Sequence, residues 1–310
     1  MVKKQLSTTA VLLFCLLLWA VACQERDRGA AQKKSLTVVT SLFPLYDFAK
    51  NIGKDKADVS LLLPPGVEPH SFEPKPGDVL RIHDADIFIY TDAAMEPWVT
   101  KILQSIESKN LLVVEAGKGI SLMNEPSDEV GEHGGTDPHI WLDFANAQRM
   151  VDTICEGFSA KDPAHKTFYA DNARAYNSLL SALDSRYMKT LTHCKHSDIV
   201  HGGHFAFGYL AKRYNLHYVA AYGFSPDSES TPRRLYDLSE MIKQKGIKYI
   251  FYEELLSPRV AETIARETGV SLLKLSAAHN ITKEELMQNV TFISIMKQNL
   301  KNLATGLQCP

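Results

Sequence analysis

The sequence predicts an α/β protein made of two lobes, each built on a parallel sheet, that one long backbone helix joins. Short apolar runs alternate with amphipathic helical segments over residues 35–160, and the same alternation returns over residues 192–310. Between them, residues 161–191 contain no Gly and a single Pro. Strands that alternate with helices are typical of parallel sheets, and a long segment nearly free of helix breakers favours one continuous helix.

The composition is that of an ordinary globular protein. Of 310 residues, 45% are hydrophobic and 23% are charged, a balance that excludes a disordered chain and a small disulfide-rich scaffold. Lys and Arg number 34 against 36 Asp and Glu, which gives a net charge of -2. Because nucleic-acid binders carry a basic excess, we expect no nucleic-acid partner.

The first 22 residues have the pattern of a cleaved export signal. Lys3 and Lys4 precede an apolar run over residues 10–21 that is too short to span a bilayer comfortably. The run ends at Ala22 and Cys23, a junction that resembles a bacterial lipoprotein signal, so we expect residues 1–22 to be removed and Cys23 to carry lipid. An ordinary secreted protein is the alternative, and in both cases the mature chain works outside the cytoplasm.

The segment that follows, residues 23–34, is polar and shows no apolar period. We interpret it as a tether between a membrane and the folded domain. The anchor would hold the protein at the periplasmic face of a membrane or at the cell surface.

Residues 35–160 form the predicted N-terminal lobe. Apolar and β-branched runs predict strands at 36–40, 58–63, 86–90 and 111–114. Helical spacing of apolar residues predicts helices at 45–52, 78–84 and 97–106.

Residues 161–191 form the predicted linking helix, about 45 Å long at 1.5 Å per residue. Apolar side chains recur at spacings of three to five residues, at Phe168, Ala173, Tyr176, Leu180, Leu183, Tyr187 and Leu191. Because bending such a helix breaks consecutive backbone hydrogen bonds, we expect the two lobes to move little on ligand binding.

Residues 192–310 form the predicted C-terminal lobe. Its strands are expected at 198–200, 216–221, 249–252 and 271–275. Its helices are expected at 205–214, at 233–245, in a segment that ends at Gly269, and from Thr282 to about Leu307.

Three cysteines remain after the signal and the lipidated residue: Cys155, Cys194 and Cys309. An oxidising compartment allows one internal pair among three thiols. We predict Cys155 with Cys194, because Cys309 lies in a terminal segment that is expected to fray.

Three of the eleven histidines stand in contexts that core packing does not explain. His70 lies in a proline-rich loop after a predicted strand, His139 follows Asp-Pro, and His204 lies between a strand and a helix. Loops at strand ends are where α/β proteins hold ligands. Asp143, four residues after His139, is available to orient a ring nitrogen of that histidine.

These segments resemble the metal-binding subunits of bacterial zinc and manganese ABC importers. The motifs Pro-His-Ser-Phe-Glu-Pro around His70, Asp-Pro-His-Ile-Trp-Leu around His139 and His-Phe-Ala-Phe-Gly-Tyr around His204 carry the resemblance, which covers almost the entire mature chain. The resemblance implies a monomeric solute-binding protein that catalyses no reaction. It would capture a divalent transition metal with His70, His139 and His204 and deliver it to a membrane permease.

The sequence departs from that family at a fourth metal ligand. Many relatives place an aspartate after the last strand, where this chain has Ser276. The fourth ligand is therefore water, Glu68, His279 or Glu253, and we assign Glu253 to orienting a histidine rather than to binding metal. His201, His193 and His196 are expected to lie outside the site, and of the loop at residues 128–136, where zinc-type relatives carry many histidines, only His133 remains.

The ligand types favour zinc. Manganese-type relatives have Glu at the position of His204 and complete the site with aspartate, and imidazole suits Zn²⁺ better than Mn²⁺. Manganese is the alternative metal. Two other classes compete: a zinc hydrolase, against which the sequence has no His-Glu-x-x-His helix, and a surface adhesin, for which it offers no signal.

Overall fold

The structure, a computed structural model, describes residues 35–124, 136–224, 230–253 and 255–310. Residues Leu36–Pro310 form one compact unit. The predicted signal peptide at 1–22, the lipidated Cys23, the tether at 23–34 and His133 lie outside the described residues. Within the described part of the chain, no helix combines the length and apolar character needed to cross a bilayer.

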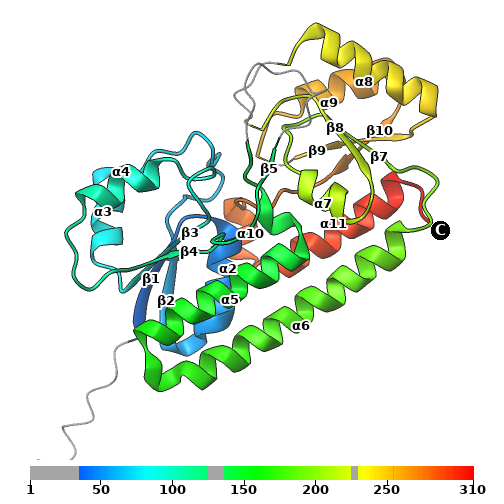
Figure 1. Cartoon of the computed structure of the whole chain (residues 1–310). Coiled ribbons are helices and arrows are strands. Elements are labelled where there is room, and N and C mark those ends of the chain that lie inside the picture. The colour runs from blue at the N-terminus through cyan, green and yellow to red at the C-terminus, as the bar shows by residue number, and fades with distance from the viewer. Residues whose placement is uncertain (1–34, 125–135, 225–229, 254) are drawn as a thin grey trace, which may run out of the picture. The chain divides into compact units, whose positions relative to one another are not determined.

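Two four-stranded parallel sheets confirm the predicted α/β class (Figure 1). The sheet of the N-terminal lobe has the order β2-β1-β3-β4, with β1 Leu36–Thr40, β2 Ala57–Leu61, β3 Ile87–Tyr90 and β4 Leu112–Glu115. The sheet of the C-terminal lobe has the order β10-β9-β7-β8, with β7 Asp198–His201, β8 His217–Ala220, β9 Tyr249–Tyr252 and β10 Ser271–Lys274. A short antiparallel pair joins β5 Met123–Asn124 to β6 Thr136–Asp137.

Helices follow the strands as the sequence predicts. The N-terminal lobe contains α2 Phe43–Gly53, α3 Pro76–His83 and α4 Trp98–Ser105. The C-terminal lobe contains α7 Gly208–Arg213, α8 Pro232–Lys245 and α9 Arg259–Thr268. In Figure 1, α8 and α9 lie on one side of the second sheet and α11, Phe292–Gly306, on the other.

The long helix is α6, Lys166–Leu191, and it runs past both sheets (Figure 1). It begins five residues later than predicted because Pro163–His165 forms a separate 3-10 turn. Its buried face contains Tyr169, Ala173, Tyr176, Leu180, Leu183, Tyr187 and Leu191. The predicted period is therefore correct, except that Tyr169 rather than its neighbour Phe168 is fully buried.

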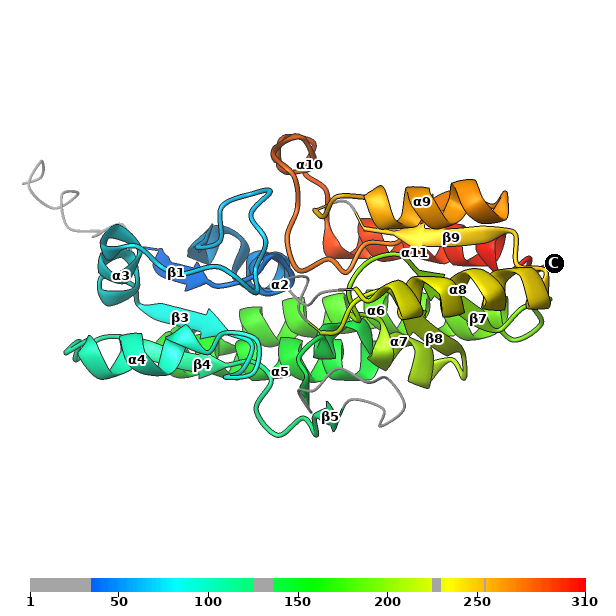
Figure 2. The ribbon, with the colours of Figure 1, turned by 90° about the horizontal axis from the view of Figure 1, so that it is seen from above.

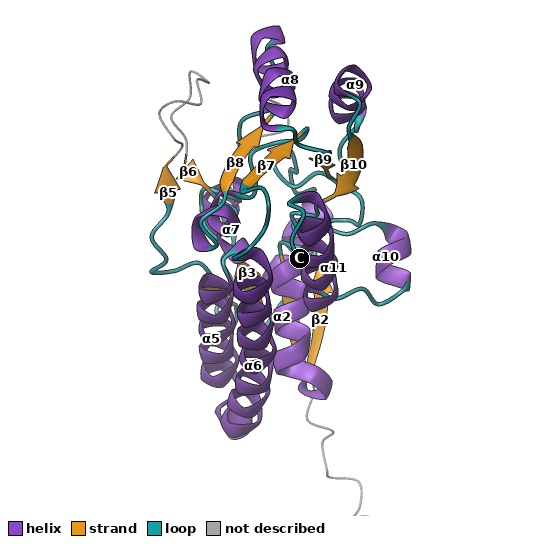
Figure 3. Cartoon of the chain, turned by 90° about the vertical axis from the view of Figure 1, so that its right-hand side faces the viewer, coloured by secondary structure: helices purple, strands orange, loops and turns teal. Residues whose placement is uncertain are grey.

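A helix that the sequence interpretation missed, α5 Phe144–Lys161, precedes α6 and packs along it (Figure 3). Asp143 caps its first turn, since its carboxylate accepts from the backbone N–H groups of Ala145 and Asn146. Its apolar face, which includes Met150 and Phe158, is fully buried.

The predicted last helix is two helices, α10 Lys283–Met287 and α11. Each begins at its own threonine cap, Thr282 and Thr291, and the backbone at Asn289 between them takes a left-handed φ of 53°. Figures 2 and 3 show α10 projecting away from the neighbouring helices.

One hydrophobic core runs through both lobes, with members on α2, α6 and α11. A buried carboxylate ties these three helices together. Asp47 on α2 accepts from the hydroxyl of Tyr176 on α6 at 2.6 Å and from the backbone N–H of Phe292 on α11 at 3.2 Å. The two lobes are therefore packed against a shared set of helices.

The predicted disulfide is wrong. Cys194 pairs with Cys309, and Cys155 is a free, half-buried thiol. The C-terminal segment does not fray, because the backbone of Gln308 accepts from Lys195 and Leu307 next to it is fully buried. Because α6 runs back along α5 and continues beyond it, Cys155 and Cys194 lie about 30 Å apart along the helix axis.

Candidate metal centre

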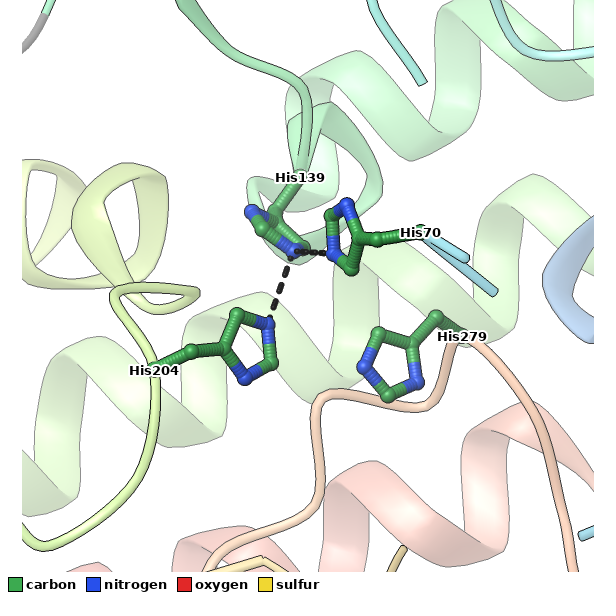
Figure 4. Close-up of side chains that lie close together, drawn as sticks. All are labelled: His70, His139, His204 and His279. Atoms are coloured by element: carbon green, nitrogen blue, oxygen red, sulfur yellow. Dashed lines mark hydrogen bonds between the residues drawn. The ribbon is translucent and has the colours of Figure 1, made fainter. Parts of the chain in front are cut away.

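Four histidines converge where the two lobes meet: His70, His139, His204 and His279 (Figure 4). Each contributes one ring nitrogen, and these four nitrogens all lie within 4.8 Å of one another. We call this group the four-histidine cluster. The three histidines singled out from the sequence are thus brought together, and His279 joins them.

Three members of the cluster follow the carboxyl ends of parallel strands. His70 comes after β2 in the first sheet, and His204 and His279 come after β7 and β10 in the second. His139 stands just before a short 3-10 turn, Ile140–Leu142, that leads into α5. Open α/β sheets present their ligand-binding loops at this edge, so the topology itself assembles the cluster.

His139 is held by Asp137. The Nδ1 atom of His139 lies 2.9 Å from Asp137 Oδ1, and the backbone N–H of His139 donates to the same oxygen at 3.0 Å. The role predicted for Asp143 is therefore wrong, because Asp143 caps α5 and pairs with Arg213 at 2.9 Å. The sequence signal for Asp137 was its place in the Asp-Pro-His motif itself.

His204 is held by Glu253, as predicted. Glu253 Oε1 lies 2.8 Å from Nδ1 of His204 and accepts the backbone N–H of His204 at 3.0 Å. Both residues are almost fully buried. Gly203 is required here, since a Cβ at that position would overlap the Glu253 carboxylate. Glu253 therefore fixes the histidine ring and stays outside the cluster.

The Asp137 and Glu253 carboxylates determine which ring nitrogen of His139 and of His204 carries the free lone pair. With Nδ1–H directed at a carboxylate, a neutral imidazole presents an unprotonated Nε2. The Nε2 atoms of His139 and His204 lie 3.2 Å apart, and the Nε2 atoms of His70 and His139 also lie 3.2 Å apart. Lone pairs at this distance repel unless a cation or a proton lies between them.

His279 is only 2% exposed, and neither of its ring nitrogens has a hydrogen-bond partner among the described residues. A buried polar ring without a partner costs free energy. Glu68, another predicted option for the fourth position, lies outside the cluster: its Oε2 accepts from the backbone and hydroxyl of Ser71, and its Oε1 is buried without a partner among the described residues. His201 also lies outside the cluster, with its Nδ1 against the backbone oxygen of His204.

Burial keeps three of the four imidazoles neutral. Desolvation lowers the pKa of His70 to about 2 and the pKa of His279 to about 3, and it lowers the pKa of His139 well below the usual value. Burial also acts to lower the pKa of His204, but the Glu253 carboxylate outweighs it and the pKa is raised. His204 is therefore the imidazole of the cluster that most readily takes a second proton, and burial also raises the pKa of Asp137, beside His139, to about 8.

The comparisons with known proteins agree with this picture. The family model described as "Zinc-uptake complex component A periplasmic" matches residues 38–306. The chain is 38% identical over 315 residues to the high-affinity zinc uptake system protein ZnuA of Bacillus subtilis (strain 168), and the match covers 98% of each sequence.

Two solved structures share the fold. The metal-dependent lipoprotein YcdH from Bacillus subtilis superposes with a TM-score of 0.77 at 39% identity, over 88% of this chain and 99% of that one. The Zn(II)-bound AdcA from Streptococcus pneumoniae superposes with a TM-score of 0.76 at 37% identity, over 88% of this chain. The match spans only 58% of the AdcA chain.

Proposed function

The chain belongs to the family of periplasmic components of zinc-uptake complexes, and we propose that it binds one Zn²⁺ ion through His70, His139, His204 and His279. Members of this family are the solute-binding components of zinc uptake and are not enzymes. The ion is therefore the cargo of the protein. The chain would release it to a membrane permease driven by a cytoplasmic ATPase.

The spacing of the ring nitrogens carries the proposal. Zn²⁺ binds histidine nitrogen at 2.0–2.1 Å in tetrahedral geometry, which separates two ligand nitrogens by about 3.3 Å. The two Nε2 distances of 3.2 Å match this edge. A Zn²⁺ ion between those nitrogens would replace the repulsion of their lone pairs by coordination and would give the buried ring of His279 a partner.

The composition of the cluster favours zinc over manganese as the bound metal. It also favours a binding site over a catalytic one. Four imidazoles form a nitrogen-only set, whereas Mn²⁺ prefers oxygen donors. A catalytic zinc keeps one position open for water, but four histidines fill a tetrahedral shell. The Asp137 and Glu253 carboxylates, each on a ring nitrogen, raise the basicity of their histidines, as outer partners of zinc ligands do.

The sharpest test is competition for metal. The mature chain, titrated with Zn²⁺ and Mn²⁺ at equal concentration, should bind zinc at a stoichiometry of one. A crystal structure of the zinc complex, with anomalous scattering measured above and below the zinc edge, should place the ion among the four histidines. Displacement of bound Zn²⁺ by Mn²⁺ in the titration would reject the assignment.

The protein acts outside the cytoplasm, as the periplasmic components of its family do. We further propose that lipid on Cys23 anchors the chain to a membrane and that residues 23–34 act as the tether. The basis is the junction at Ala22 and Cys23.

A further inference from the structure

The loop that carries His279, residues 275–281, follows β10 in the C-terminal lobe but is bonded to the N-terminal lobe. Three donors of the N-terminal lobe reach carbonyls of this loop: Trp141 Nε1 to Ala277 at 2.8 Å, Phe43 N to His279 at 3.2 Å and Gly66 N to Ile281 at 2.8 Å. We call this segment the His279 loop. These bonds hold the His279 loop against the N-terminal lobe, which also carries His70 and His139.

Asn280 makes the most specific of these contacts. Its side chain is fully buried, and Nδ2 donates to the carbonyl oxygens of Pro64 at 2.8 Å and Val67 at 2.7 Å. Its Oδ1 accepts the backbone N–H of Ile281 at 2.8 Å. Both N–H donors of the amide are therefore used, and both bond to one turn of the N-terminal lobe.

That turn leads directly to His70. The backbone N–H of Val67 donates to Pro64 at 3.1 Å, and Gly66 within the turn has a φ of 84° that favours glycine. The ring of His70, three residues later, has the ring of His139 as its only hydrogen-bond partner among the described residues. The position of His70 therefore depends on the loop backbone that Asn280 holds.

On its other side Asn280 follows His279 directly. Ala278, just before that histidine, has a left-handed φ of 58°, which is uncommon for a residue with a Cβ. A strained backbone persists only where its surroundings hold it. The bonds of Asn280 to the turn supply such a restraint next to His279.

We propose that Asn280 is a positioning residue of the metal site, which locks the turn at residues 64–67 to the His279 loop so that His70 and His279 are presented together. The inference rests on the proposed zinc site. It adds a residue that touches no metal and that couples two ligands from different lobes.

The chain offers a matched control in Asn299. This asparagine of α11 is 2% exposed, its Nδ2 donates to the Ser276 carbonyl at 2.8 Å, and its Oδ1 accepts the Ser276 N–H at 2.9 Å. It holds the same loop with a buried amide, but it bonds within the C-terminal lobe and does not reach the turn before His70.

The experiment compares Asn280→Asp with Asn299→Asp in the full mature chain, with and without His70→Ala. Each Asp keeps the shape of the side chain and removes its two N–H donors. We expect Asn280→Asp to weaken zinc binding about 10- to 100-fold, as loss of an outer partner does, and to have a smaller effect once His70 is Ala, because only its restraint on His279 then remains. The effect of Asn299→Asp should be the same in both backgrounds. Asn280→Ala repeats the comparison without adding a charge.

Two further readouts separate positioning from general destabilisation. Amide hydrogen exchange over residues 64–72 of the zinc-free protein should accelerate in Asn280→Asp and not in Asn299→Asp. The visible spectrum of the Co²⁺-loaded Asn280→Asp protein should weaken, because more than one water molecule takes the place of the displaced His70 and raises the coordination number above four.

The outcomes distinguish this inference from the function on which it rests. If His70→Ala leaves zinc affinity unchanged, the four-histidine site is wrong. If His70→Ala lowers the affinity but Asn280→Asp acts equally in both backgrounds, the site stands and the role of Asn280 is wrong.

Discussion

Glu253 Oε1 accepts two hydrogen bonds from His204, one from the ring at 2.8 Å and one from the backbone at 3.0 Å. The pair is fully buried, so its charges are poorly screened. The carboxylate raises the pKa of His204, and the imidazolium in turn lowers the pKa of Glu253 to about 2 although burial alone would raise it. The same contact therefore orients the ring and makes it the imidazole of the cluster that most readily takes a second proton.

The first prediction is that protonation of His204 makes zinc affinity depend on pH. A proton on His204 competes with Zn²⁺, so affinity should fall as the pH drops through the raised pKa of this residue, which lies above the usual 6.5. The pKa values of His70 and His279 are about 2 and 3, so these rings do not compete near neutral pH.

Chelator competition between pH 8 and pH 5 should therefore give a slope of log affinity against pH that rises toward one as the pH falls below the raised pKa of His204. Glu253→Gln removes the charge that raises the pKa of His204, so the fall should begin at a lower pH in that variant. A slope of three or four in the unmodified protein would contradict this account.

The second prediction concerns metal preference at His279. Replacing His279 with Asp introduces an oxygen donor, which should weaken Zn²⁺ binding and narrow its advantage over Mn²⁺. The matched control is His279→Ala, which removes the ligand without supplying oxygen from the protein and should weaken both metals. Competition titrations of the two variants check this, with His83→Ala on the exposed side of α3 as a variant that should bind normally.

The third prediction concerns the disulfide. Cys194 and Cys309 are 115 residues apart, so their bond removes much of the freedom of the unfolded chain. Chain-entropy arguments give about 5 kcal/mol as an upper value and 2–4 kcal/mol as typical for such a bond. Cys309→Ser should lower the free energy of unfolding accordingly in urea titrations.

Cys155→Ser is the control for the disulfide, because Cys155 is a free thiol on α5 and its replacement should leave the bond intact. Peptide mapping without reductant should recover Cys194 linked to Cys309. Recovery of Cys155 in a disulfide would show that the pairing described here is incorrect.

The fourth prediction concerns the anchor. Cys23→Ala removes the thioether-forming side chain, so the protein should move from the membrane fraction to the soluble extracytoplasmic fraction. Zinc affinity should not change, because the four-histidine cluster is formed by residues 70–279. Unchanged membrane retention in this variant would refute lipidation at Cys23.

The sequence predicts those parts of the site that are local. His70, His139 and His204 were found because each lies in a short motif, and the strands before His70 and His204 were predicted from runs of apolar residues. Asp137 was missed although it is two residues from His139. Whether Asp137 or Asp143 orients the ring of His139 depends on the 3-10 turn at Ile140–Leu142. This turn redirects the chain so that Asp143 caps the first turn of α5.

The parts that the sequence could not settle depend on contacts between distant segments. His279 was one of several options for the fourth position, and only the attachment of its loop to the N-terminal lobe brings its ring to the cluster. The cysteine pairing failed for the same reason, since it depends on the packing of the last residues against the end of α6. Such contacts leave no periodic pattern in a single sequence.

The last prediction is that the lobes move little when zinc binds. The hydrophobic core continues through α2, α6 and α11, and Asp47 bonds to both Tyr176 and Phe292 across these helices. A hinge between the lobes would have to break these buried bonds and expose apolar surface, which costs more free energy than a rearrangement of loops. Small-angle scattering of the mature chain should therefore give the same radius of gyration with and without zinc. Amide exchange in α6 should be unchanged, while exchange in the loops of His70 and His279 should slow. A marked compaction on zinc addition, or altered exchange along α6, would show that the shared helices act as a hinge instead.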